Sequence, residues 1–330
     1  PVTRKGTNFE VAFSQGRADF RDKFDGLEVH TEIVVSPEDD IEMRRVHITN
    51  RSGKRRNLDV TSYSEVVIAP ASADNAHPAF SNLFVETELL TDSNAILCSR
   101  RPRTEGEKPP LMFHLMKMHG KQATQTSYET NRMNFTGRTN TLKSPSAMRQ
   151  KGALSNTQGA VLDPIVSIRY EFSLAVEETI VFDVLLGAAE TRDKCVQMVA
   201  KYQDKNHKDR VFDLAWTHSQ IVLHQIKATE AEAQLYTRLA GSIIYLNPAM
   251  RAEGSVLARN TKGQAGLWPY SISGDLPIVF ARIEDHTNIE FIKQLIQAHS
   301  YWRMKGLPVD LVIWNETYSG YRQDVENLLI

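Results

Sequence analysis

Cysteine is scarce in this sequence. Among 330 residues only Cys98 and Cys195 occur, and neither belongs to a CxxC pair. This argues against a disulfide framework and against a thiolate zinc site, and it favours a reducing compartment such as the cytoplasm.

Net charge and long apolar runs are also lacking. Lys plus Arg number 39 and Asp plus Glu number 40, which leaves a net charge of -1. No sequence-wide field exists to attract a polyanion, so no nucleic-acid partner is expected. No apolar run reaches the ~18 to 20 residues that a bilayer-spanning helix needs, so we expect this segment to make no membrane contact.

Common catalytic motifs are missing as well. The sequence contains no GxSxG elbow, no Walker loop, no GxGxxG and no HExxH. His114 and His119 stand close together, but an odd offset on a strand puts two side chains on opposite faces. We therefore predict no metal site and no cofactor.

What is present is ordinary globular composition, with 41% hydrophobic and 24% charged residues in a chain long enough for two domains. Between residues 28 and 180 apolar residues recur at every second position, which is typical of strands with one buried face. Further strands are predicted at 83–90, 95–99, 111–116, 125–130 and 165–172. Many strands at this spacing predict a large antiparallel β-sandwich.

Three local features of this half need interpretation. The apolar parity changes between Met43 and Val46, which predicts a bulge or a face switch near Arg45. Turn residues at 50–53 before the run 58–68 predict a hairpin, and its basic cluster, Arg51, Lys54, Arg55 and Arg56, is either a solvated tip or an anion site. The polar stretch 136–159 is either a binding or interface loop or an ordinary surface loop.

After residue 186 the period becomes helical. Thr191 can cap one helix, and another is expected from about Asp209. Thr229 with Glu232 and Thr287 with Glu290 match capping boxes ahead of two amphipathic runs, and Gly306 ends the second. The run 309–314 is a strand or a buried linker. Residues 321–328 begin a last helix with no stop signal, so we expect a fragment of a longer polypeptide.

One segment carries candidate chemistry. Residues 259–277 (RNTKGQAGLWPYSISGDLP) mix aromatic rings with carboxylate, amide and guanidinium groups. A pyranose needs that mixture, because its C–H faces rest on a ring while its hydroxyls bind polar groups. The alternative is a helix-connecting loop whose Trp268 fills the core. The candidate sugar-binding residues are Asp275, Trp268, Tyr270, Gln264 and Arg259.

The same segment resembles glycoside hydrolase family 94, the inverting glycoside phosphorylases formerly called glycosyltransferase family 36. The resemblance begins with residues 272–278 (ISGDLPI), preceded by Gly266-Leu267-Trp268. Longer strings at 28–52, 59–88, 160–169, 213–220 and 297–316 look most like the phosphorylase-like part of cyclic β-1,2-glucan synthases. Together these strings extend over nearly the whole chain.

The resemblance implies a multidomain architecture of α and β elements. It comprises a β-sandwich (super-sandwich) at 1–190, a helical linker at 191–228, and the start of an (α/α)6 barrel at 229–330. Twelve barrel helices need roughly 140 residues before any loops, more than 229–330 contain. The resemblance therefore implies a chain that ends inside the barrel.

The family mechanism implies roles for only some residues. In these enzymes phosphate attacks the anomeric carbon while one Asp protonates the leaving oxygen, and no segment here matches the motif of that acid. No catalytic residue is assigned, and the chain alone is expected to be inactive. Asp275 is implied to contact the donor glucose. An Arg found six residues earlier in cellobiose-type relatives is Pro269 here, which favours the β-1,2-glucan branch.

Two functions follow as hypotheses. The first is part of an enzyme that makes or phosphorolyses β-linked glucans, with inorganic phosphate as co-substrate and a β-linked gluco-oligosaccharide as ligand. The second is a non-catalytic carbohydrate-binding or dimerisation scaffold, with a homodimer formed through the β-sandwich. The resemblance implies one of two parents, an inner-membrane cyclic glucan synthase or a cytosolic oligoglucan phosphorylase, and either parent would place this segment in the cytoplasm.

Overall fold

The computed structural model describes residues 8–245, 247–284 and 288–316. Contacts divide the chain into two compact units, Pro1–Thr217 and His218–Ile330, so the boundary falls inside helix α5 (Lys205–Gln225). The finer three-part division predicted from the sequence stays a prediction. Thr287 and the predicted helix at 321–328 lie outside the described residues.

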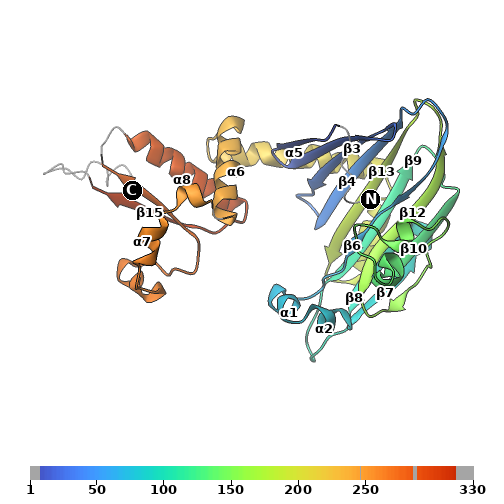
Figure 1. Ribbon diagram of the computed structural model, residues 1–330, viewed down its shortest axis with the longest axis horizontal. Helices are drawn as coiled ribbons and strands as arrows, with labels where there is room; N and C mark the ends of the chain where they lie inside the picture. The colour runs from blue at the N-terminus through green and yellow to red at the C-terminus, as the bar shows by residue number, and fades with distance from the viewer. Residues whose placement is uncertain (1–7, 246, 285–287, 317–330) are drawn as a thin grey trace. The chain divides into compact units, whose positions relative to one another are not determined.

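Two antiparallel sheets form most of the first unit (Figure 1). The larger sheet has nine strands, in the spatial order β1 (Glu10–Ser14), β2 (Arg17–Phe24), β3 (Leu27–Val35), β4 (Ile41–Asn50), β13 (Thr179–Ala189), β9 (Leu111–His119), β8 (Ala95–Arg100), β7 (Val85–Leu90) and β11 (Gly159–Ala160). The smaller sheet has the order β10 (Gln125–Asn131), β12 (Pro164–Leu174) and β5 (Arg56–Thr61), and β6 (Ser64–Glu65) also pairs with β12. The predicted antiparallel sandwich is confirmed, although β1 and β2 were not predicted.

The space between the two sheets is the main core. Alternate residues of β12, including Ile168, Tyr170 and Phe172, face buried residues of β13 such as Phe182. The Tyr170 hydroxyl donates a hydrogen bond to the Met116 carbonyl at 2.5 Å. Alternation of this kind is what a half-buried strand requires.

The other face of the large sheet is covered by α4 (Arg192–Lys201) and the first part of α5. Met43, Phe113 and Leu185 pack there against Met198 and Tyr202. The central strands of the large sheet, β4, β13 and β9, are therefore buried on both faces. The Thr191 side chain accepts a hydrogen bond from the Lys194 amide, which confirms the predicted cap, while α5 begins at Lys205, before the predicted Asp209.

This double burial explains the parity change on β4. Met43 faces the helices, whereas Ile48 faces the smaller sheet together with Val46. Strand β4 pairs with β3 and β13 without a register shift. Of the two alternatives predicted near Arg45, the bulge is therefore wrong and the face switch is confirmed, because two opposed cores, rather than an extra residue, reverse the pattern.

The hairpin predicted after residue 50 is also wrong. Strand β5 pairs with β12 of the smaller sheet, so the turn carries the chain from one sheet to the other. The Asn50 side chain holds this turn by donating to the carbonyls of Lys54 and Ala175 at 2.8 and 2.9 Å. Gly53 has φ +72°, which few other residues adopt.

The stretch 136–159 covers the outer face of the smaller sheet. With the preceding α3 (Arg132–Thr136) it encloses Phe135 and Leu154 against Ile165. Buried Arg169 on β12 fastens this cover, donating to the carbonyls of Gly152 at 2.9 Å and Ala147 at 2.7 Å. A long loop thus serves as a fourth layer of the unit.

Short elements complete the first unit. They are α1 (Ala71–Ala76), α2 (Pro78–Asn82) and the 3-10 turns η1 (Thr91–Ser93) and η2 (Ser146–Met148).

The second unit combines helices with a small parallel sheet. Its elements are α6 (Glu230–Ile244), η3 (Pro248–Met250), α7 (Gly254–Ala258), η4 (Gln264–Gly266), η5 (Trp268–Tyr270), β14 (Ile278–Ile283), α8 (Ile289–Met304) and β15 (Asp310–Asn315). The capping box of Thr229 and Glu232 is confirmed at the start of α6.

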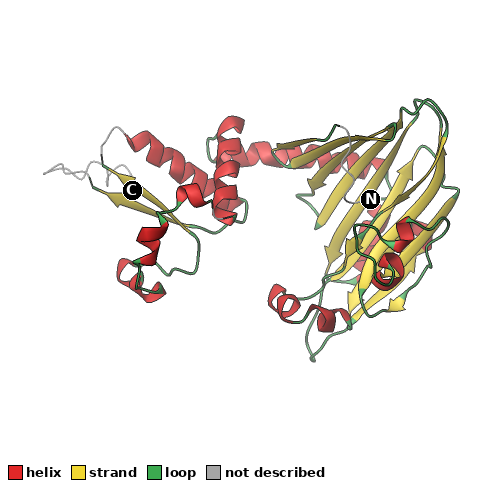
Figure 2. Ribbon diagram, in the orientation of Figure 1, coloured by secondary structure: helices red, strands yellow, loops and turns green. Residues whose placement is uncertain are grey.

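Strands β14 and β15 pair in parallel and are joined by α8, which lies alongside them (Figure 2). The strand alternative for residues 309–314 is confirmed, but β14 was not predicted. The predicted start of an (α/α)6 barrel consists of helices alone and did not include this sheet. The barrel therefore stays a proposal. Buried Tyr236, Ile283 and Trp302 belong to the core of this unit.

Candidate functional site

The segment predicted to bind sugar lies between α7 and β14. The turns η4 and η5 fold it back on itself, because the Tyr270 and Ser271 amides donate to the carbonyls of Leu267 and Trp268. Ser271 has φ +59° and Gly274 φ +76°. A Cβ on Gly274 would lie 2.9 Å from Gln264 Cγ, so glycine is required there by both angle and space.

This folding gathers three of the predicted residues. Gln264 Nε2 donates to Asp275 Oδ1 at 2.8 Å and to the Ser273 carbonyl at 2.9 Å. Trp268 Nε1 donates to the same carbonyl at 3.3 Å. An amide, an indole and a carboxylate that are distant along the loop therefore share one small cluster.

The cluster is open to solvent. Trp268 is 62% exposed, which rules out the alternative that this ring fills the core. Asp275 is exposed too, and among the described residues its Oδ2 has no hydrogen-bond partner. The arrangement offers an apolar ring beside a free carboxylate oxygen, which suits a sugar hydroxyl and a neighbouring C–H face.

The other two predicted residues stand apart from this cluster. Arg259 follows α7, and its Nε donates to the Ser255 carbonyl at 3.3 Å. Tyr270 is 70% exposed, and no hydrogen bond joins it to Gln264 or Asp275. Their roles in sugar binding stay predictions.

A buried charge cluster in the first unit was missed by the sequence reasoning. Asp183 on β13 accepts from Arg45 Nε at 2.8 Å and from His119 Nε2 at 2.6 Å. Lys208 of α5 lies 3.4 Å from the same carboxylate, and the side chains of Asp183 and Lys208 are both 0% exposed. An Asp within the apolar run 180–186 was the available signal.

The electrostatics of this cluster are internally balanced. Burial works to raise the pKa of Asp183, but hydrogen bonds from His119 and Arg45 outweigh it and hold that pKa well below its usual range. Burial lowers the pKa of Lys208, and the charge of Asp183 offsets this only in part. The cluster joins the sheet to α5. Because the side chains of Asp183 and Lys208 are enclosed, a substrate cannot reach them.

Histidines and carboxylates meet at one further place. Asp19, His30 and Glu32 could present ligand atoms to a metal ion. The Arg17 guanidinium, however, lies 2.7 Å from Asp19 and 2.6 Å from Glu32, so a cation already pairs with each of these carboxylates. His114 and His119 have separate partners, Ser62 and Asp183, as expected for opposite faces.

The first unit is thus a large antiparallel sandwich backed by helices, and an exposed loop of the second unit brings an amide, an indole and a carboxylate together. Residues 1–205 match the model of the glycosyl hydrolase 94 supersandwich domain. The chain therefore belongs to glycosyl hydrolase family 94.

Two relatives extend this assignment. The chain is 31% identical over 329 residues to the cyclic beta-(1,2)-glucan synthase NdvB of Rhizobium meliloti (strain 1021). This alignment covers 100% of this chain and 12% of NdvB. The chain is also 23% identical over 201 residues to the solabiose phosphorylase of Paenibacillus borealis. That alignment covers 61% of this chain and 25% of the phosphorylase. The chain thus spans a small part of the length of either relative.

A solved structure is more distantly similar. A bacterial glucoamylase in complex with acarbose matches 68% of this chain and 30% of its own, with a TM-score of 0.38 and 8% identity. In the part of the chain that the structure describes, no helix combines the length and the apolar character needed to cross a bilayer.

Proposed function

We propose that this chain is part of an inverting glycoside-phosphorylase-type enzyme that makes or phosphorolyses β-linked glucans. Family membership and the full-length match to a protein named a cyclic β-1,2-glucan synthase support this. They also favour β-1,2-linked glucose as the ligand, inorganic phosphate as co-substrate of the whole enzyme, and a cytoplasmic location.

The observation that carries the proposal is the cluster of Gln264, Trp268 and Asp275. Gln264 fixes one carboxylate oxygen of Asp275 and leaves the other free, beside an exposed indole. A glucosyl unit would donate a hydroxyl to Oδ2 and rest a C–H face on Trp268. Tyr270 and Arg259 are flanking candidates on the same loop.

The proposal assigns no catalytic acid to this chain. No segment matches the Trp- and Asp-containing motif that supplies the acid in the family, so residues 1–330 alone are expected to release no phosphate with β-linked glucose oligomers. We also propose that α6 and α8 belong to an (α/α)6 barrel, with β14 and β15 as an addition to it.

Calorimetric titration with β-1,2-linked gluco-oligosaccharides tests the site. Asp275→Ala removes a charged hydrogen-bond acceptor, which costs on the order of 1.5 to 3 kcal/mol, so affinity should fall at least about tenfold. Asp213→Ala removes a second exposed carboxylate and should leave affinity unchanged. Equal affinity of the Asp275→Ala variant and the wild type would remove Asp275 from the site.

A second candidate function is a scaffold that binds carbohydrate without turnover or dimerises through the sandwich. The observation that favours it is strand β1, which forms one edge of the nine-stranded sheet and is exposed along its whole length. Sugar binding without turnover in the full-length parent would favour this candidate over the enzyme.

A further inference from the structure

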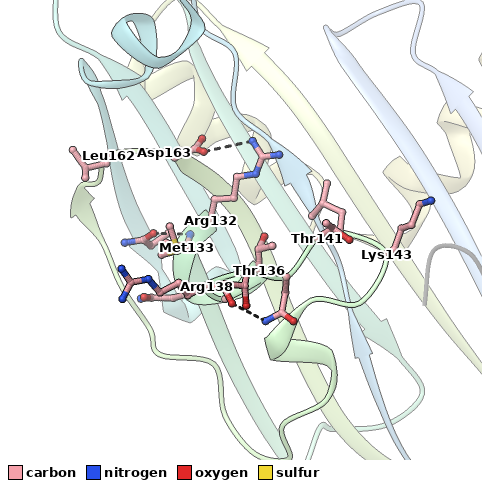
Figure 3. Close-up of a pocket in the computed structure, with 14 residues that line it drawn as sticks. Arg132, Met133, Thr136, Arg138, Thr141, Lys143, Leu162 and Asp163 are labelled. Carbon is pink, nitrogen blue, oxygen red and sulfur yellow. Dashed lines mark hydrogen bonds and ion pairs between the residues drawn. The ribbon is translucent and has the colours of Figure 1, made fainter.

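A large cavity opens where β10 ends and β12 begins. Its volume is about 920 Å³, and residues 131–134 and 136–143 together with Leu162 and Asp163 line it (Figure 3). It lies in the first unit, whereas the loop of residues 259–277 belongs to the second. Ligand pockets for small molecules commonly have volumes of roughly 300 to 1,000 Å³.

The walls of this cavity are held by specific contacts. Asn131 accepts a hydrogen bond from the Met133 amide at 2.9 Å, and Arg132 bridges Asp163 at 3.4 Å and Glu65 at 3.1 Å. Gly137 has φ +81°, and a Cβ there would lie 2.6 Å from Ser146 Cβ. The lining loop therefore has a defined shape.

One polar atom of the lining lacks a partner. Thr136 Oγ1 is buried and makes no hydrogen bond in the described part of the chain. A buried hydroxyl without a partner costs about 1 to 3 kcal/mol, a cost that a ligand with a matching group would remove.

Charge in the lining is one-sided. Its one carboxylate, Asp163, already accepts from Arg132 and from Asn82. Arg138 and Lys143 are exposed and form no ion pair with any described residue. The remaining lining is amide, hydroxyl and apolar, with Met133 61% and Leu162 76% exposed. The cavity therefore offers many hydrogen-bond donors and no free carboxylate.

We propose that this cavity binds an anionic saccharide, a sugar whose phosphate or carboxylate group meets Arg138 or Lys143. The amides of Asn134 and Asn140 and the hydroxyl of Thr136 serve its hydroxyl groups, while Met133 and Leu162 contact its apolar face. No aromatic ring is among the 14 residues that line the cavity, which disfavours a nucleobase. This inference does not rest on the proposed glucan site.

Calorimetry on the whole chain at low salt tests it with four probes: glucose 6-phosphate, tri-galacturonate, neutral maltotriose and inorganic phosphate. We expect at least one of the two acidic sugars to bind at least about tenfold more tightly than maltotriose and inorganic phosphate. The two acidic sugars distinguish a phosphate ligand from a carboxylate ligand.

Three variants, a double substitution, its charge-matched control and a single substitution, locate the binding. Arg138→Ala combined with Lys143→Ala should weaken the acidic sugar at least about tenfold, whereas Lys54→Ala combined with Lys108→Ala removes the same charge elsewhere and should have no effect. Thr136→Val should weaken binding several-fold without lowering the melting temperature, because its hydroxyl has no partner to lose.

Several outcomes would overturn the inference. The first is that neither acidic sugar binds. The second is that maltotriose or inorganic phosphate binds as tightly as both acidic sugars. The third is that the Arg138→Ala and Lys143→Ala variant keeps the wild-type affinity for the acidic sugar. Asp275→Ala is predicted to leave this binding intact. A failure of the proposed anionic-saccharide site and a failure of the proposed glucan site are therefore separate results.

Discussion

Asp183 shows how a single buried carboxylate organises a surface between sheet and helix. Arg45, His119 and Lys208 come from three different elements and converge on it. Removing one partner of a buried ion cluster is costly, because the remaining charges stay out of water without compensation. The carboxylate thus constrains where α5 can lie on the sheet.

Asp183→Asn keeps the side-chain shape and removes the charge that balances these cations. We expect it to lower the free energy of unfolding by about 3 to 5 kcal/mol, measured by guanidinium denaturation at pH 7. Asp209→Asn is the matched control, because Asp209 pairs with the same Arg45 but is 42% exposed, and should cost less than about 1 kcal/mol. Equal costs for the two variants would contradict the assigned role.

His114 predicts a pH dependence of stability. Burial lowers its pKa to about 4, and its Nε2 lies 2.7 Å from the Ser62 hydroxyl. The unfolded chain has a histidine pKa of about 6.5. As the pH falls from about 6.5 to 4, His114 becomes protonated in the unfolded state but stays neutral in the folded state. The free energy of unfolding therefore decreases by on the order of 3 kcal/mol.

Replacing the titrating group tests this. In His114→Gln the loss of stability between pH 7 and pH 4 should be smaller than in the wild type by that amount, as measured by denaturant unfolding across the pH series. His77→Gln, at an exposed histidine, should keep the wild-type slope. An unchanged slope in the His114→Gln variant would assign the acid sensitivity to other groups.

At the candidate site, local composition predicted part of the geometry. Trp268, Gln264 and Asp275 could be selected because their chemistry suits a sugar and they lie within one short loop. That Gln264 donates to Asp275 could not be predicted, since it depends on two turns and a glycine at φ +76°. The cluster around Asp183 was missed because its members are far apart in the sequence, and only strand pairing together with the packing of α5 on the sheet brings them together.

Among whole elements, periodicity identified strands and helices well but not their partners. The capping box at Thr229 and the strands β7, β8, β9, β10 and β12 follow from local signals. The pairing of β5 with β12 instead of β4 depends on which sheet each strand joins. Period alone carries no information about that choice, and for the same reason it could not decide between a bulge and a face switch on β4.

Gly187 tests the packing of β13 between its neighbours. A Cβ at this position would lie 2.5 Å from Phe113 Cε1 on β9 and 2.7 Å from Ile41 Cγ2 on β4. Gly187→Ala should therefore destabilise the protein by about 1 to 3 kcal/mol through overpacking.

Gly241 within α6 is the matched control, because a Cβ there meets no atom within 4 Å. Gly241→Ala should stabilise its helix by about 0.5 to 1 kcal/mol. Opposite shifts of the thermal transition in the two variants are expected, and a stabilising Gly187→Ala would show that β9 and β4 are less tightly packed around β13.

For the whole molecule, strand β1 bears on the predicted homodimer. Its outer edge pairs with no strand in the described part of the chain, so backbone donors and acceptors are free along it. Phe9, Val11 and Phe13 are large, exposed and spaced by two, which places them on one face of the sheet. Natural sheets seldom leave an apolar edge open, because it readily pairs with another chain.

We therefore predict that the chain self-associates through β1. Sedimentation velocity over a concentration series should show a dimer, and Phe13→Lys should raise its dissociation constant at least about tenfold by placing a charge in the contact. Phe291→Lys changes another exposed phenylalanine, on α8 of the second unit, and should leave association unchanged. A monomer at every concentration, or equal effects of the two variants, would exclude the β1 edge as the contact.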